Sequence, residues 1–321
     1  MIKKITGTWF EFWHHNRPEG KYWNPIITSF SEEQWEAKVD EIASLGMKYI
    51  VLLTSAQVYD NEAWAYFKTD IYPFADMAAK DPMGAVLRAA DRNGIKVFVS
   101  CGFFGNWNQT ENNMTSPEVQ KRAFRAMEQL YALYGKHESF YGWYLPDELG
   151  IWPYYPDSFI KYVNEYTAFG KGLDKAHKVL IAPYGTNHAK TDDNFVRQLE
   201  AMDCDIVAYQ DEIGVRKSTP DQTGAYFEAL RKAHDKAAKS AMWADMEVFE
   251  FEGEVYKSAL IPAKVERVER QLEAISCYCD EVLCYQYMGM MNKPGTIAFC
   301  GHPESIEYYR AYKKMIDEKV K

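Results

Sequence analysis

A chain of 321 residues with 47% hydrophobic side chains can bury one large core, and no stretch approaches the ~20 consecutive apolar residues of a membrane-spanning helix. The formal net charge is −9 and no basic run compensates for it locally, so neither nucleic acid nor an anionic membrane is an expected partner. The six cysteines form no CxxC pair, and we expect buried free thiols.

The first residues, MIKKITG, carry two lysines but no apolar segment follows them, so no signal peptide is predicted. A cytoplasmic protein, or a secreted or periplasmic one whose leader has been removed, is equally compatible with this sequence. It does not specify an oligomeric state.

Short β-rich apolar runs alternate with amphipathic helical stretches along the chain. The candidate strands begin near Ile5, Met47, Ile95, Phe140, Val179, Asp205, Ala241 and Glu281. Their spacing of about 25 to 50 residues leaves room for a crossover helix between parallel strands. Eight such units predict one (β/α)₈ barrel over residues 1–321, with its working face at the C-terminal strand ends. The rival fold is an open doubly wound sheet, but no GxGxxG or P-loop pattern follows any strand.

The segments between these strands carry helix start and stop signals. Ser31 to Gln34 form a capping box, and Ser116 and Thr219 each precede a proline as N-caps do. Gly46 and Gly94 lie where a helix would end just before a strand.

Three of the predicted strands end in acids. Strand four ends in Asp147 and Glu148, strand six in Asp211 and Glu212, and strand seven in Asp245 and Glu247. Burying an unpaired carboxylate is costly, so acids at a barrel mouth are expected to react or to pair with a cation. Glycoside hydrolysis needs two carboxyls on opposite sides of the scissile bond. Strands four and seven face each other across the mouth, so Glu148 and Glu247 are the predicted catalytic pair.

The pattern resembles clan A glycoside hydrolases, which carry the acid/base glutamate after strand four and the nucleophilic glutamate after strand seven. It also resembles a bacterial barrel family of unknown function related to that clan. The motifs are Ile5-Thr6-Gly7-Thr8-Trp9, Trp35, Leu45-Gly46, Gly142 to Glu148, Gln210-Asp211 and Asp245-x-Glu247. This resemblance implies a TIM barrel, a carbohydrate substrate and no cofactor or metal. The clan commonly has Asn before the strand-four glutamate, whereas this chain has Asp147, which puts the usual contact to the sugar 2-hydroxyl in doubt.

Aromatic residues make up 15% of the chain, and flat rings are surfaces on which sugars stack. The predicted substrate-binding residues are aromatic or polar side chains near strand ends: Trp9, Glu11, Trp13, Asn106, Trp107, Tyr144, Asp147, Tyr184, Tyr209, Asp211, Gln286 and Tyr287. Glu11 and Trp13 belong to this set if their face of strand one points into the barrel. Asp245 would lie one layer below Glu247, as an orienting residue or half of a metal site.

Two alternatives to hydrolysis remain open. A divalent-metal sugar isomerase or lyase would use Glu148, Asp211, Asp245 and Glu247 as oxygen ligands, with His188 the nearest histidine. The His14-His15 pair suggests metal binding only weakly, because adjacent side chains on an extended segment diverge. A catalytically silent sugar-binding barrel is the other alternative, because a fold does not prove chemistry.

The hydrolase hypothesis makes geometric and electrostatic predictions. A retaining enzyme would place the two carboxyls about 5 to 5.5 Å apart. Glu148 should have a raised pKa, next to a ring and to acidic Asp147, whereas Glu247 should be ionised and near a donor such as Tyr209 or Gln286.

Overall fold

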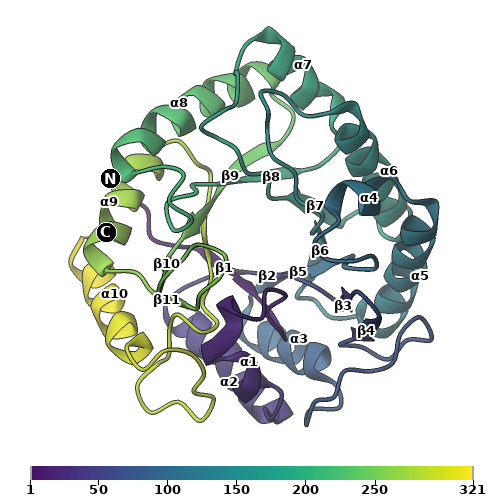
Figure 1. Ribbon diagram of the computed structural model, residues 1–321, viewed down its shortest axis with the longest axis vertical. Coiled ribbons are helices and arrows are strands. Elements are labelled where there is room, and N and C mark those ends of the chain that lie inside the picture. The colour runs from purple at the N-terminus through teal and green to yellow at the C-terminus, as the bar shows by residue number, and fades with distance from the viewer. Residues whose placement is uncertain (1, 320–321) are drawn as a thin grey trace.

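Eight parallel strands hydrogen-bond in a closed ring, and helices surround that ring (Figure 1). The computed structural model describes residues 2–319. In ring order the strands are β1 (Gly7–Phe10), β2 (Tyr49–Leu52), β5 (Lys96–Ser100), β6 (Phe140–Leu145), β7 (Lys178–Ile181), β8 (Ile206–Gln210), β9 (Ala241–Glu247) and β12 (Val282–Tyr285), which pairs with β1 again. The predicted TIM barrel is confirmed, and each of its eight strands begins within two residues of the predicted position.

The helices occupy the segments between these strands. They are α1 (Asn24–Ile27), α2 (Glu32–Ser44), α3 (Pro82–Asn93), α4 (Thr110–Thr115), α5 (Pro117–Tyr134), α6 (Asp157–Leu173), α7 (Asp193–Ala201), α8 (Pro220–Ala237), α9 (Val265–Ile275) and α10 (Ser305–Lys319), with a 3₁₀ helix, η1 (Glu19–Tyr22). Ser31 and Gln34 form the predicted capping box at the start of α2. Gly94 ends α3 at a φ of 65°, a left-handed conformation that glycine adopts without strain.

Alternate residues of each strand point inward and fill the barrel. The inward-facing apolar cluster is Trp9, Val51, Leu53, Phe98, Tyr144, Leu180, Ala182, Ile206, Ala208, Trp243 and Leu283. The residues between them point outward and pack under the helices. Trp9 and Tyr144 meet edge to face, with ring centroids 5.9 Å apart. This layer closes the barrel interior, so a ligand can only bind above it.

Two antiparallel hairpins are added at the C-terminal end of the barrel. One is β3 (Ala56–Tyr59) with β4 (Glu62–Ala65), and the other is β10 (Phe249–Phe251) with β11 (Leu260–Pro262). The repeat of eight strand–helix units did not predict either hairpin. Both lie within the connections that follow barrel strands, where a functional face would be built.

The cysteines are free, as predicted, and five are buried, but Cys277 is exposed, contrary to expectation. Among residues 2–319, no helix has the length and apolar character needed to cross a membrane.

Candidate active site

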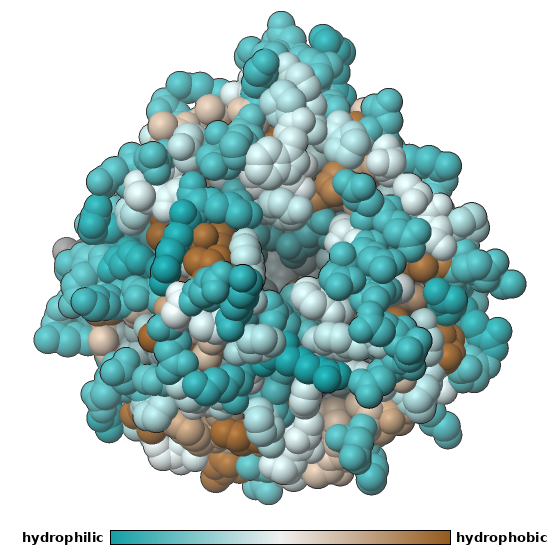
Figure 2. Space-filling model, viewed as in Figure 1, coloured by the Kyte–Doolittle hydropathy of each residue, from teal (hydrophilic) through white to brown (hydrophobic). Residues whose placement is uncertain are grey.

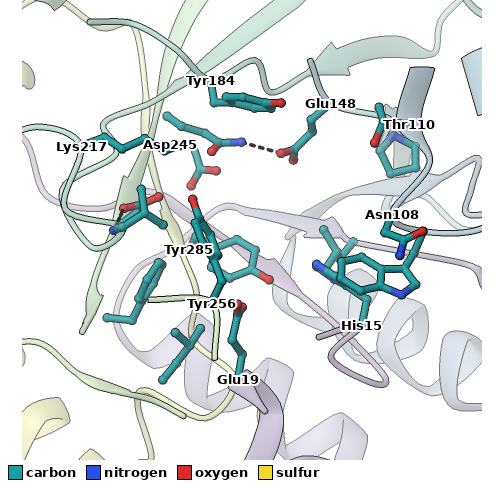
Figure 3. A pocket seen from close by; sticks show the side chains of 18 of the residues that line it. His15, Glu19, Asn108, Thr110, Glu148, Tyr184, Lys217, Asp245, Tyr256 and Tyr285 are labelled. Atoms are coloured by element: carbon teal, nitrogen blue, oxygen red, sulfur yellow. Dashed lines mark hydrogen bonds between the residues drawn. The ribbon is translucent and has the colours of Figure 1, made fainter. Parts of the chain in front are cut away.

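A cavity of about 370 Å³ opens at the C-terminal ends of the barrel strands. Figure 2 shows the hollow at the centre of this face, and Figure 3 shows the side chains that line it. Its walls come from the ends of β8, β9 and β12 and from the connections that follow β1, β2, β5, β6, β7, β8 and β9. Residues from distant parts of the sequence therefore meet in one place because the barrel aligns all strand ends.

Glu148 follows β6 and points into this cavity (Figure 3). Tyr144, on the inner face of the same strand, donates its hydroxyl to Oε1 at 2.5 Å. Gln210, at the end of β8, donates Nε2 to Oε2 at 2.6 Å. Burial raises the pKa of Glu148 to about 7, against the opposing effect of these two donors and with a further upward contribution from Asp147. The predicted upward shift is therefore found.

Glu247 ends β9 and lines the same cavity. Its carboxylate accepts a hydrogen bond from the backbone N–H of Val215 at 2.8 Å. Burial first, and then the charge of Asp211, raise the pKa of Glu247 to about 8. The expectation that Glu148, and not Glu247, would have the raised pKa is therefore wrong, because both carboxyls are buried. The expected donors are also wrong, because Tyr209 bonds to His234 and Gln286 bonds to Glu11 instead.

Asp245 lies on the inner face of β9, two residues before Glu247, and also lines the cavity (Figure 3). It is 2% exposed, and its Oδ1 has no hydrogen-bond partner among the described residues. Burial and the charges of Glu148, Glu247 and Asp211 raise its pKa well above the ordinary value. An ionised carboxylate without a donor is costly at this depth, so Asp245 favours its protonated form.

The loop after β1 is fixed by a buried ion network. Glu11 accepts hydrogen bonds from Trp23 at 2.8 Å and from Gln286 at 2.7 Å. His14 donates Nδ1–H to Glu11 at 3.0 Å and Nε2–H to Glu19 at 2.9 Å. Burial alone would lower the pKa of His14, but the two carboxylates outweigh it and raise the pKa to about 10. His14 is therefore an imidazolium that ties Glu11 to Glu19.

One group of potential metal ligands stands out among residues 2–319. Ligand atoms of Glu11, His14 and His15 all lie within 4.8 Å of one another. Both ring nitrogens of His14 already bind carboxylates, however, which accounts for this cluster without an ion. The four acids of the metal-enzyme alternative form no group of three at that spacing within the described part of the chain.

Four of the fourteen predicted site residues line the cavity: Glu148, Glu247, Trp107 and Tyr184. Two more lie in the layer beneath it, where Trp9 packs against Tyr144. Tyr209 and Tyr287 point outward, and their hydroxyls bond to His234 and Glu41. The rings of Trp9, Tyr144, Tyr209 and Tyr287 therefore do not line the cavity.

The remaining predicted residues support the walls or face elsewhere. Asp147 accepts a hydrogen bond from Asn113, and Asn106 donates one to Asp60. The ring of Trp13 contacts Trp64, and Asp211 accepts the backbone N–H of Glu247. Glu11 and Gln286 belong to the hydrogen-bond network of His14. Asp147 thus takes no part in the cavity wall, and burial raises its pKa to about 7.

Sequence reasoning missed several residues that line the cavity. Among them are His15, Glu19, Gln210, Lys217, Tyr256 and Tyr285. Lys217 pairs with buried Glu212 at 3.3 Å and lies over the ring of Tyr184, with 5.1 Å between Nζ and the ring centroid. The inward alternation of β8 and β12 was the signal for Gln210 and Tyr285, but no sequence pattern points to the loop residues.

Residues 5–298 match the family described as a domain of unknown function, DUF4434. The chain belongs to this family. Among proteins with curated functions, none matches the sequence. The family of unknown function that the sequence resembled is thereby confirmed.

Solved structures with the same fold include glycoside hydrolases. A candidate α-L-fucosidase from Bacteroides thetaiotaomicron VPI-5482 has 16% sequence identity and a TM-score of 0.73, with 98% of this DUF4434 chain and 95% of that chain covered. The endo-1,4-β-D-mannanase of Thermotoga petrophila RKU-1 has 11% identity and a TM-score of 0.59, with 98% and 100% covered. The endo-1,4-β-mannanase of Rhizomucor miehei has 10% identity and a TM-score of 0.55, with 99% and 95% covered. At these identities the likeness establishes the shared barrel fold.

Proposed function

We propose that this protein is a retaining glycoside hydrolase with a carbohydrate substrate, in which Glu148 is the acid/base and Glu247 the nucleophile. The observation that carries the proposal is that two buried carboxyls, from the fourth and seventh strands of the ring, line one cavity. The hydrolases with the same barrel fold support it.

In the first step, Glu148 gives its proton to the glycosidic oxygen while the carboxylate of Glu247 attacks the anomeric carbon. The glycosidic bond breaks, the alcohol leaves, and the sugar is esterified to Glu247. In the second step, Glu148 accepts a proton from water as the water oxygen attacks the anomeric carbon. Glu247 is released as a carboxylate and the anomeric configuration is retained.

The surrounding residues support this chemistry. Tyr144 and Gln210 hold both oxygens of Glu148, so the carboxyl keeps one orientation while its proton moves. Trp107 and Tyr184 offer rings on which a sugar can stack. Because the pKa of Asp245 is raised, its neutral form is favoured, which limits the negative charge beside Glu247.

The test is a screen of aryl glycosides against the wild-type protein, Glu148→Gln and Glu247→Gln. We expect Glu247→Gln to abolish turnover of every substrate. Glu148→Gln should lose about 10²- to 10⁴-fold with poor leaving groups but retain activity on activated ones, which need no protonation. Glu266→Gln, an exposed glutamate on α9, is the control and should match the wild type.

The stereochemistry of the product tests the retaining mechanism separately. Proton NMR should show the first-formed sugar with the anomeric configuration of the substrate. An inverted product would reassign Glu247 as a general base. A wild-type protein that cleaves none of these glycosides, but binds sugars in the cavity, would make the silent sugar-binding barrel the better description.

A further inference from the structure

A second cavity, of about 450 Å³, lies next to the candidate active site. It is bounded by the loop after β1, the β3–β4 hairpin and residues 75–77. Most of its lining is aromatic or apolar, including Phe12, Trp13, Trp64 and Tyr66. The proposed chemistry at Glu148 and Glu247 makes no use of this cavity.

The loop after β1 separates the two cavities. His15 and Glu19 line the candidate active site, whereas Trp13 and Arg17 line the second cavity. The hydrogen bonds of His14 to Glu11 and Glu19 hold this loop in place. The two cavities are therefore neighbours on the same face of the barrel, with one fixed wall between them.

A series of aromatic rings connects one cavity to the other. Trp107, which lines the candidate active site, lies 5.8 Å from Tyr59 between ring centroids. Tyr59 stacks on Trp64 at 6.1 Å, and Trp64 meets Trp13 at 6.5 Å. All four rings are partly exposed. The three centroid distances lie between 5.8 and 6.5 Å, so a series of contacting rings links the two cavities.

Polar groups border these rings in the second cavity. Arg17 lies 4.7 Å from the ring centroid of Tyr59 and pairs with Glu62 at 2.9 Å. The indole N–H of Trp13 is buried and has no hydrogen-bond partner among the described residues, so Arg17 is the exposed donor beside these rings. Rings with nearby donors suit a sugar, whose C–H face stacks on the ring while its hydroxyls accept hydrogen bonds.

We propose that this second cavity is a distal subsite, which binds sugar units of an oligosaccharide whose reacting bond lies at Glu148 and Glu247. This inference rests on the proposed glycosidase function and narrows its substrate class to glycans of three or more sugars. It also gives a role to Trp13, which lies beside the catalytic cavity and not within it.

The test measures binding to an array of defined glycans of one to six sugars, with Glu148→Gln so that the ligands are not consumed. We expect glycans of three or more sugars to bind more tightly than mono- and disaccharides. Adding Trp64→Ala or Trp13→Ala should weaken binding of these long glycans about tenfold and leave mono- and disaccharides unchanged. Trp64→Phe keeps a ring and should recover most of the affinity. Because Trp64→Phe keeps the packing of the hairpin, it separates loss of the sugar contact from misfolding of the hairpin.

Trp152→Ala is the matched control, because Trp152 is exposed and lines neither cavity. It should leave all affinities unchanged. Equal losses for short and long glycans in Trp64→Ala and Trp64→Phe, or no loss at all, would overturn the subsite.

The glycan array and the aryl glycoside screen together separate the two proposals. A wild-type protein that cleaves no glycoside, while long glycans still bind in a Trp64-dependent way, would keep the subsite and remove the hydrolase. Hydrolysis of aryl monosaccharides without any effect of length or of Trp64 would do the opposite. Absence of binding to every glycan would overturn both.

Discussion

Glu148 is held between two opposing influences. Burial favours its neutral form, whereas the hydrogen bonds from Tyr144 and Gln210 favour the charged form. The balance puts its pKa at about 7, close to the pH at which most proteins work. A group with this pKa can give up and regain a proton in the same catalytic cycle. Burial and the two donors together therefore set the pH range of the proposed reaction.

Tyr144→Phe tests this balance. Removing a donor to the carboxylate should raise the pKa of Glu148 further, since the charged form loses one hydrogen bond. Glu148 must be protonated in the first step, so the alkaline limb of kcat/KM should move upward, by about one pH unit. The pH–rate profile on an activated aryl glycoside measures it. Tyr209→Phe is the control, because that hydroxyl bonds to His234, and an equal shift in both variants would refute this explanation.

At the scale of elements, the end of β9 is anchored by α9 and by the end of β8. Gln271 donates Nε2 to Asp211 at 2.6 Å and to the backbone oxygen of Glu247 at 3.0 Å. Arg267 donates to the same oxygen at 2.8 Å. Asp211 accepts the backbone N–H of Glu247 at 3.0 Å. Asp211 thus positions Glu247 from outside the cavity, where sequence analysis expected it to touch the sugar.

Gln271→Leu tests this anchor. The substitution leaves one oxygen of buried Asp211 without its donor, which should cost about 1–3 kcal/mol of stability. It should also displace Glu247, so kcat should fall about 10- to 100-fold with little change in KM. Arg270→Ala, an exposed neighbour on α9, should keep both kcat and stability. Stability loss at full kcat would mean that the anchor is structural only.

Register explains which site residues were predicted and which were not. On β8 the inward residues are Ile206, Ala208 and Gln210, so Tyr209 faces the helices although it is the more obvious sugar platform. On β12 the inward residue at the mouth is Tyr285, one position before the predicted Gln286. A shift of one residue exchanges the two faces of a strand, and composition alone does not fix it.

At the scale of the whole molecule, the barrel was predictable because its pattern repeats. Eight strand runs at crossover spacing and local signals such as Ser31 and Gly94 indicate the same fold. Glu148 and Glu247 could be predicted because closure of the ring places strand ends together. The hairpins and the loop from Trp13 to Glu19 could not be predicted. Their conformations depend on tertiary contacts such as the His14 network, which leave no periodic signal.

The acids in and around the candidate active site are buried, which makes the stability of the fold depend on pH. Burial raises the pKa of Asp147, Glu148, Asp211, Asp245 and Glu247. A carboxyl with a folded pKa above its unfolded value binds more protons in the folded state. Its contribution to stability is therefore greatest below the unfolded pKa and is lost as pH rises towards the folded one. With shifts to between about 6 and 8 at four of these groups, we expect stability to fall from pH 5 to pH 8.

Asp245→Asn tests one of these groups, the buried acid whose Oδ1 has no hydrogen-bond partner among the described residues. Asn cannot ionise, so the variant should have a higher Tm than the wild type at pH 8, with a smaller difference at pH 5 and a flatter Tm–pH curve between them. Asp193→Asn, at an exposed position at the start of α7, should follow the wild-type curve. Thermal unfolding followed by circular dichroism across this range measures the difference. A wild-type Tm that rises with pH, or an Asp245→Asn variant less stable than the wild type at pH 8, would show that Asp245 is ionised and stabilised by a cation. In that case the acids at the barrel mouth would support metal-dependent chemistry better than hydrolysis.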